Sequence, residues 1–218
     1  MLLFLNEIDT QLLLAINGYR SGWADSFMYL FSGKLIWVPM YASILYVILK
    51  NYHWKLALGC VMAIGLTIVF ADQVGASIMR PYFERLRPSN LDNPISDLVQ
   101  IVNGKRGGRY GFPSCHAANT FGLAFFIFYL FRNKLLTIFL MLWALVTCYS
   151  RSYLGVHYPG DLLVGAVLGF IGASLCYWLF TLYAHRIGIK KPTRVAFLLL
   201  PIIIGGTTIV GMAVYSLF

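Results

Sequence analysis

The sequence predicts an all-α integral membrane protein: a six-helix bundle with an interfacial N-terminal helix. Three observations lead to this fold class. Of the 218 residues, 59% are hydrophobic and only 11% are charged, whereas a soluble domain carries roughly 25% charged residues. Long apolar segments recur between short polar loops, as in helical membrane proteins. The formal net charge of +9 is typical of loops beside anionic headgroups, so it indicates a lipid bilayer as the partner and not nucleic acid.

The first 33 residues are expected to form an interfacial segment. Between Leu2 and Gly18 the apolar residues follow helical spacing with acids between them, which is typical of an amphipathic helix lying on a membrane surface. Residues 19–32 are mixed and aromatic, and we assign them to the interface as well. No cleavable signal peptide is evident, because Glu7 and Asp9 stand where a basic n-region would be.

Six apolar segments follow, and each is predicted to cross the membrane. They run from about Lys34 to Leu49, Leu56 to Met79, Ser114 to Phe131, Leu135 to Ser150, Leu162 to Ala184 and Ala196 to Leu217. The second contains Asp72, and an acid within hydrocarbon indicates a supporting partner for an arginine or a direct role. No repeat or change of composition divides the chain, so residues 1–218 are expected to form a single domain.

The charges in the loops predict the orientation. The loops after the first, third and fifth spans contain basic residues and no acid, so they should stay in the cytoplasm. Those basic residues are Lys50, Lys55, Arg132, Lys134, Arg186, Lys190, Lys191 and Arg194. The loops at 80–111 and 151–161 then face the other side, as do both termini. These two loops are also basic, against the rule, and an anionic ligand is one reason to keep arginines there.

The stretch from Ser150 to Asp161 contains the clearest candidates for catalytic side chains. Arg151 offers a planar guanidinium that suits a tetrahedral oxyanion, and His157 can act as a nucleophile or a proton carrier near neutral pH. If Pro159 opens the next helix, Asp161 lies in its first turn and can hold the imidazole. The alternative is an ordinary loop with a snorkelling arginine and a capping aspartate.

Two further stretches suggest an anion site. Arg80, Arg85 and Arg87 follow directly on an apolar segment, either as a clamp for phosphate or as a snorkelling belt. A helix that begins near Ser114 would aim free N–H groups and its positive end at the same loop, with the serine hydroxyl as a cap or a phosphate ligand. His116 lies in its first turn and can donate a proton, or it is only an interfacial histidine.

Together the three stretches resemble the signature of the type 2 phosphatidic acid phosphatase superfamily. This group includes membrane lipid phosphatases, class A acid phosphatases and vanadium haloperoxidases. The family pattern is K-x6-R-P, then P-S-G-H, then S-R-x5-H-x3-D. The chain meets it as Arg80-x6-Arg87-Pro88, Pro113-Ser114-Cys115-His116 and Ser150-Arg151-x5-His157-x3-Asp161. The match covers about residues 72 to 161, and it implies a helical phosphatase core like that of the class A acid phosphatases.

The resemblance implies a role for each matching residue. The substrate phosphate would be bound by Arg80, Arg87, Ser114, Cys115 and Arg151. The catalytic residues would be His157 as nucleophile, Asp161 as its orienting carboxylate, and His116 as proton donor and later as base.

Two positions depart from the pattern. Arg80 stands where lysine is usual, so a planar fork replaces a point charge. Cys115 stands where glycine is usual, so a side chain enters a position where the backbone closely approaches the ligand.

No metal or other cofactor is expected. Cys60, Cys115, Cys148 and Cys176 are scattered without paired spacing, which gives neither a disulfide framework nor a zinc site. No cluster of carboxylates is present to hold Mg²⁺, and arginines can supply the charge that phosphoryl transfer requires.

The rest of the outer loop, residues 89–112, is basic and rich in glycine. Its cations are Lys105, Arg106 and Arg109. They could grip a second phosphate or a sugar, or they could belong to a solvated loop beside anionic lipid.

These observations predict a metal-independent membrane lipid phosphatase that works through a phosphohistidine. Candidate substrates are undecaprenyl diphosphate, phosphatidylglycerol phosphate, phosphatidic acid and a lipid A phosphate. In a bacterium the protein would lie in the inner membrane with its site facing the periplasm. A phosphotransferase would use the same phosphohistidine with another acceptor. A non-catalytic lipid-phosphate carrier is disfavoured by the intact histidines and aspartate, and a haloperoxidase by the membrane spans. The oligomeric state cannot be predicted.

Overall fold

The computed structural model describes residues 2–190, 192 and 195–218, and their regular secondary structure is helical. The α-helices are α1 (Leu2–Gly18), α2 (Gly22–Phe31), α3 (Val38–Asn51), α4 (Trp54–Asp72), α5 (Arg80–Phe83), α6 (Cys115–Phe131), α7 (Lys134–Tyr153), α8 (Pro159–Arg186) and α9 (Leu200–Tyr215). Two short 3₁₀ turns lie at Leu35–Trp37 and Ser96–Leu98, and a π-helical segment, Gln73–Met79, joins α4 to α5. The predicted all-α class is confirmed.

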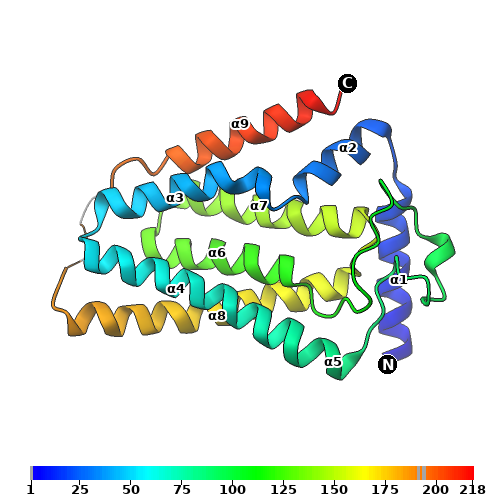
Figure 1. The fold of residues 1–218 in the computed structure, drawn as a ribbon, viewed down its shortest axis with the longest axis horizontal. Coiled ribbons are helices and arrows are strands. Elements are labelled where there is room, and N and C mark those ends of the chain that lie inside the picture. The colour runs from blue at the N-terminus through cyan, green and yellow to red at the C-terminus, as the bar shows by residue number, and fades with distance from the viewer. Residues whose placement is uncertain (1, 191, 193–194) are drawn as a thin grey trace.

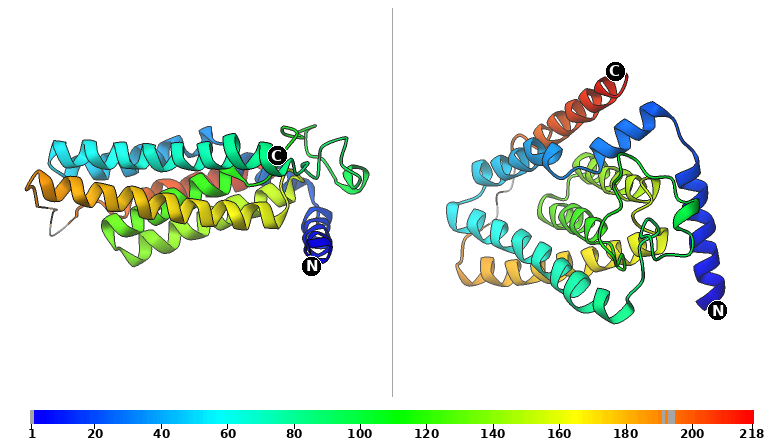
Figure 2. Two further views of the ribbon diagram at one scale, coloured as in Figure 1. Left: turned by 90° about the horizontal axis from the view of Figure 1, so that it is seen from below. Right: turned by 45° about the vertical axis from the view of Figure 1, so that its right-hand side comes forward.

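The long helices lie side by side, and α1 crosses one end of the bundle (Figures 1 and 2). The same end carries the irregular segment between α5 and α6, the turn between α7 and α8, and both termini (Figure 1). The turns that join α3 to α4 and α6 to α7, and the connection from α8 to α9, lie at the opposite end (Figure 1). The motif-bearing loops and the acid-free basic loops are therefore segregated to different ends, except that Lys191 and Arg194 lie outside the described residues.

Glycines let α8 pack closely on α6. A Cβ atom on Gly165 or Gly169 would collide with the backbone carbonyl oxygens of Ser114 and Ala118. Without a driving force from water, helices in lipid associate through this kind of close approach of small residues. The contact aligns the N-terminal ends of α6 and α8, which bear the second and third motifs.

The main core fills the space between α3, α4, α6, α7 and α8, and it is rich in aromatic side chains. Trp37, which is 2% exposed, packs edge-on against both Phe31 and Trp143, and its indole nitrogen donates to the Phe31 carbonyl. This cluster fixes the break between α2 and the helix that follows.

Several helices have the length and composition of membrane spans. Three qualify alone: Trp54–Phe83, Lys134–Tyr153 and Pro159–Arg186. A fourth span is possible if Gly22–Phe31 and Leu35–Asn51, bent by 70°, count as one. Among the described residues α6 and α9 are shorter apolar helices. The predicted number of six spans stays a prediction.

Two boundaries differ from the expectation. The second apolar helix does not end at Met79 but continues to Phe83, so Arg80 lies on a helix and not in a loop. Residues 19–32, assigned to the interface as one mixed stretch, contain α2, and its Phe27 and Phe31 are buried against the bundle. The predicted helix at Leu2–Gly18 is confirmed as α1, and its interfacial position stays a prediction.

Candidate active site

The three motif stretches meet at the end of the bundle that α1 crosses. The Ser114 N–H donates to the Asp161 carbonyl at 3.0 Å, which joins the second motif to the third. Arg87 joins the first motif to the third by donating to the Val156 carbonyl at 2.9 Å. Arg87 and Val156, which are 69 positions apart in the chain, are thus brought into one polar cluster.

His157 lies at the centre of this cluster and is 1% exposed. Its Nε2 lies 2.7 Å from Nη1 of Arg87. A guanidinium can only donate, so Nε2 must be the acceptor and carry the lone pair. The ring proton then lies on Nδ1, which faces Oδ2 of Asp161 at 3.4 Å. Burial, followed by the charges of Arg87, Arg151 and Arg80, holds the pKa of His157 well below its usual value, so the imidazole is neutral.

Asp161 occupies the place that the sequence predicts. Pro159 opens α8 and Asp161 lies in its first turn, where its side chain caps the helix. Its Oδ2 accepts from the Tyr158 N–H at 3.1 Å, and its Oδ1 accepts from Arg85 Nη1 at 2.7 Å. The carboxylate is completely buried, and every one of these contacts holds it toward His157.

Three arginines act on the imidazole: Arg87 contacts Nε2, and the charges of Arg80 and Arg151 also lower the pKa of His157. Besides His157, Arg87 binds the Tyr110 carbonyl at 3.2 Å, and burial together with the charge of Arg80 lowers the pKa of Arg87 to about 10. Arg80 contacts the Pro113 carbonyl at 3.3 Å and Sγ of Cys115 at 3.2 Å. Arg151 donates to the Ser32 hydroxyl at 2.5 Å.

These arginines lack anionic partners within the described residues. None of Arg80, Arg87 and Arg151 forms an ion pair there, and Nε of both Arg80 and Arg151 is buried without a hydrogen-bond partner. Since a buried cation without a partner is costly, this side of His157 is suited to bind a multiply charged anion such as phosphate.

The N-terminus of α6 completes the cluster. Ser114 is the capping residue, and its hydroxyl oxygen accepts from the Ala117 N–H at 3.4 Å. The Cys115 side chain, at the position where the family has glycine, points to Arg80. It packs beside Gly75, where a Cβ atom would lie 3.5 Å from the sulfur. The thiol is thereby accommodated between the π-helical segment and α6.

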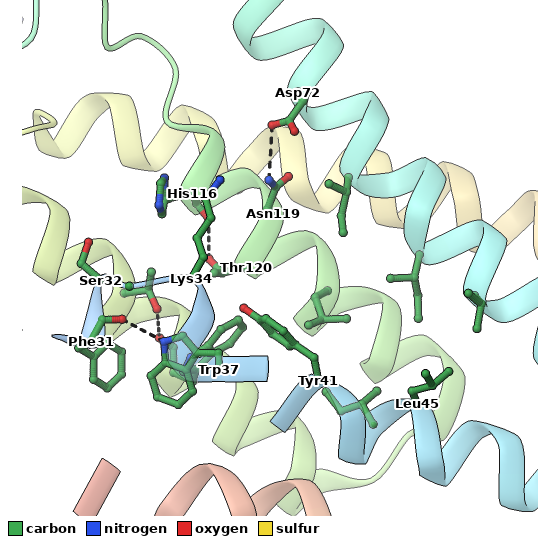
Figure 3. A pocket seen from close by; sticks show the side chains of 18 of the residues that line it. Phe31, Ser32, Lys34, Trp37, Tyr41, Leu45, Asp72, His116, Asn119 and Thr120 are labelled. Carbon is green, nitrogen blue, oxygen red and sulfur yellow. Dashed lines mark hydrogen bonds between the residues drawn. The ribbon is translucent and has the colours of Figure 1, made fainter. Parts of the chain in front are cut away.

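His116 lies at the edge of a cavity of about 510 Å³. The polar end of this cavity contains His116, Asp72, Lys34 and Ser32, as Figure 3 shows. Asn119 donates to Asp72 at 3.4 Å in the same region (Figure 3). The cavity then continues as an apolar groove lined by residues of α3, α4 and α6, among them Tyr41, Leu45, Val61, Ile64, Ile68 and Leu123.

Some residues of the site could not be found from the sequence. Arg85 was visible only as a member of an arginine cluster, and nothing indicated that it pairs with Asp161. Asp9 had no local signal, although it contacts both Arg85 and the start of α8. Ser32 and Lys34 reach the site because the chain bends between α2 and α3.

The basic residues of the outer loop take separate positions. Arg106 donates to the Ser89 carbonyl within the loop, and Arg109 pairs with Asp92 at the surface at 3.7 Å. Lys105 lies over the ring of Tyr29 at 4.8 Å. Burial, followed by the charge of Arg151, lowers the pKa of Lys105.

Metal ligands do not gather in the described part of the chain, where no three His, Cys, Asp or Glu side chains form a group that could hold an ion. The charged groups beside His157 Nε2 are guanidiniums. A buried neutral imidazole between a carboxylate and several guanidiniums suits an enzyme that transfers phosphoryl groups.

Comparison with known proteins identifies the class. Residues 54–185 match the model of the PAP2 superfamily, and the chain belongs to this superfamily, as the three motifs predicted. This membership, together with the phosphatase relatives reported next, makes the chain an enzyme, a phosphatase, and its apolar helices make it a membrane protein.

Two relatives and one solved structure resemble the chain over most of its length. A lipid A 4'-phosphatase of Bacteroides thetaiotaomicron is 60% identical over 86% of this chain and 81% of its own. A lipid A 4'-phosphatase of Porphyromonas gingivalis is 38% identical over 84% of this chain and 76% of its own. The crystal structure of Aquifex aeolicus LpxE superposes with a TM-score of 0.58 at 24% identity, covering 77% of this chain and 93% of that one, and supports the fold.

Proposed function

We propose that this membrane lipid phosphatase removes the 4'-phosphate of lipid A through a phosphohistidine on His157. One observation carries the chemistry: the buried neutral imidazole presents its Nε2 lone pair to a set of arginines that lack anionic partners. The substrate rests on the 60% identical relative, which is a lipid A 4'-phosphatase. Preferred turnover of another lipid phosphate is an alternative outcome of the test below.

In the first step, the phosphoryl oxygens bind Arg80, Arg87, Arg151 and the N-terminus of α6. The Arg87 guanidinium transfers its hydrogen bond from Nε2 to phosphate, and His157 Nε2 attacks phosphorus. The P–O bond to the lipid breaks, and His116 gives its proton to the leaving oxygen. Positive charge that develops on the imidazole is stabilised by Asp161 through Nδ1–H.

In the second step, the now neutral His116 removes a proton from water. The water oxygen attacks phosphorus, the P–N bond breaks, and its electron pair returns to Nε2 of His157. Inorganic phosphate leaves, and His116 is again protonated for the next cycle. The arginines neutralise the phosphoryl oxygens in both steps, so the reaction as proposed requires no other cation.

The groove beside His116 supports a lipid substrate. Its apolar part is lined from α3 and α4 by side chains such as Leu45, Val61 and Ile68, which are also exposed on the outer surface of the bundle. An acyl chain can lie there in contact with the bilayer, while Lys34 attracts the headgroup at the polar end (Figure 3). A soluble phosphate ester would need no such groove.

The segregation of the two ends supports an orientation. We place the chain in a bacterial inner membrane as one domain of six spans, with α1 at the outer interface. The motif-bearing core at 72–161 then opens to the periplasm together with the outer loop at 89–112. The acid-free basic loops at the other end would lie in the cytoplasm, in accordance with the positive-inside rule.

A panel of lipid phosphates tests the proposal. Purified protein in detergent should release phosphate from bisphosphorylated lipid A, and mass spectrometry of the product should show loss at the 4' position. Undecaprenyl diphosphate, phosphatidylglycerol phosphate and phosphatidic acid should be poorer substrates, and His157→Ala should be inactive on all. Preferred turnover of another lipid would contradict the substrate. Transfer of the group to an added sugar or lipid alcohol, without release of phosphate, would contradict hydrolysis.

A further inference from the structure

The carboxylate that orients His157 is itself held by a chain of charges that ends on α1. We propose that Asp9 is a positioning residue for the His157–Asp161 pair and that it acts through Arg85. This inference rests on the proposed function, because it assigns Asp9 a part in the reaction of His157. It also gives α1 a role in the active site, beyond that of an interfacial helix.

Arg85 is the link between the two carboxylates. Its Nη1 binds Oδ1 of Asp161 at 2.7 Å, and its Nη2 binds Oδ2 of Asp9 at 2.6 Å. The guanidinium also lies over the ring of Tyr158, 4.0 Å from the centroid. Burial would lower the pKa of Arg85, but the two carboxylates outweigh it and the pKa is raised. The planar guanidinium of Arg85 is thus held by Asp161, by Asp9 and by the ring of Tyr158.

Asp9 makes a second contact, directly to the start of α8. Its Oδ1 accepts from the Gly160 N–H at 2.7 Å, which is one of the free backbone donors at the beginning of that helix. A Cβ atom on Gly160 would lie 2.7 Å from Oδ2 of Asp9, so glycine lets the carboxylate approach. Asp9 therefore binds both Arg85 and the helix that carries Asp161.

The geometry of Asp161 depends on this arrangement. Its Oδ2 must remain directed at Nδ1 of His157, which lies at 3.4 Å, while Oδ1 is held by one nitrogen of Arg85. Without Asp9, both nitrogens of Arg85 are free to bind Asp161 in the bidentate manner that guanidinium and carboxylate favour. Such a pair would draw Oδ2 away from the imidazole.

The position of Asp9 is itself fixed by a second clamp on α1. About two helical turns further along, the Asn17 side chain donates to the carbonyls of Gln100 and Tyr153 at 2.9 and 2.8 Å, and it accepts from the Gln100 N–H at 2.8 Å. This clamp joins α1 to the outer loop and to the end of α7. Figures 1 and 2 show α1 running across the end of the bundle where these segments meet.

Kinetics of Asp9→Asn test the assignment against a matched control. Asparagine keeps the shape but loses the ion pair with Arg85. We expect kcat to fall about 10- to 100-fold, as for a small misplacement of a catalytic group, with little change in KM because Asp9 does not contact the phosphate. Glu7→Gln removes the same charge from an exposed position of the same helix and should leave both constants unchanged. A lower melting temperature with unchanged kcat would overturn the proposal.

A double-mutant cycle tests whether Asp9 acts through Arg85. Arg85→Lys keeps a cation but cannot bridge two carboxylates with one planar group. In that background Asp9→Asn should cost little more activity. If the two losses multiply, Asp9 acts by another route and the proposal fails.

A measurement without substrate separates this inference from the proposed function. The ¹⁵N spectrum of His157 should show a proton fixed on Nδ1 in the wild type and in Glu7→Gln. In Asp9→Asn, Arg87 still donates to Nε2, so the proton stays on Nδ1, but the Nδ1–H proton resonance should move upfield because its hydrogen bond to Asp161 weakens. An unchanged Nδ1–H resonance in Asp9→Asn would overturn the inference even if lipid A is hydrolysed. A shifted resonance in a protein that releases no phosphate would support it and reject the proposed function.

Discussion

The two sides of the His157 ring differ in how completely their polar groups are paired. On the Nδ1 side, Asp161, Arg85 and Asp9 form alternating charges with contacts of 2.6 and 2.7 Å. On the Nε2 side, Arg80 and Arg151 each retain a buried Nε without a partner in the described part of the protein. The paired side holds the imidazole in one tautomer, and the unpaired side keeps its binding capacity for a substrate anion.

The comparison predicts opposite effects on stability from the two sides. Removing a partner on the paired side leaves an uncompensated buried charge, which is strongly destabilising. Removing a cation from the unpaired side relieves an unfavourable burial, and such residues are often kept for function at the expense of stability. Activity should fall in both cases, so the sign of the change in melting temperature distinguishes the two sides.

The largest loss of activity is expected on the paired side. Asp161→Asn should retain the fold but lose roughly 10²–10⁴-fold in rate, because the amide cannot stabilise a positively charged imidazole. Its melting temperature should fall, since Arg85 loses one of its two carboxylates. Turnover and thermal unfolding in detergent measure both effects. A rate within a factor of two of the wild type would show that Asp161 does not orient the nucleophile.

On the unpaired side, Arg151→Met should lower kcat/KM by about 10²–10³-fold, the usual effect of removing one donor to a developing oxyanion. The same substitution should raise the melting temperature, because an arginine that is 5% exposed and has a buried Nε without a partner is replaced by an apolar side chain of similar length. Destabilisation by Arg151→Met would mean that Arg151 is a structural residue, and the contrast between the two sides would be lost.

The pKa of His157 predicts how stability depends on pH. Its pKa in the folded state lies well below 6.5, owing to burial and to the nearby arginines. The unfolded state therefore binds more protons below about pH 6.5, so the stability due to neutral His157 is present above that pH and falls as the pH decreases. The His157 resonance should show no titration between about pH 5.5 and 8. A midpoint near 6.5 would place the ring in an environment without the arginines.

The smallest effect is expected from metal chelators. Turnover should be unchanged in chelator, because guanidiniums supply the charge on the unpaired side. Vanadate should inhibit, since it forms a five-coordinate mimic of the transferring phosphoryl group. Loss of activity in chelator that Mg²⁺ restores would assign the charge to a metal instead.

The parts of this contrast that depend on local sequence signals could be predicted from the sequence. Pro159 and the following aspartate predicted the first turn of α8, and Ser114 predicted the cap of α6, because capping depends on a few adjacent residues. The motifs also indicated which arginines gather near the histidines. The structure places them together, and their roles remain proposals.

The rest of the paired side could not be predicted, because it depends on contacts between distant segments. Arg85 meets Asp161 and Asp9 only once α1 has crossed the end of the bundle. Asp9 lies 76 residues before Arg85 in the sequence, and Asp161 lies 76 residues after it. Ser32 and Lys34 enter the site through the bend between α2 and α3. Lys105 and Arg109 carry the same charge in the same loop, and only the folding of that loop separates their positions.

The most direct test of the central claim is detection of the covalent intermediate on His157. In His116→Ala, a substrate with an activated leaving group needs no proton, so His157 should still be phosphorylated. Hydrolysis of the intermediate should be slow because the base for water is missing. Mass spectrometry should then show an acid-labile, base-stable phosphoryl group on His157, and His157→Ala should be inactive. An adduct on another residue, or a tenth of wild-type activity in His157→Ala, would contradict the account.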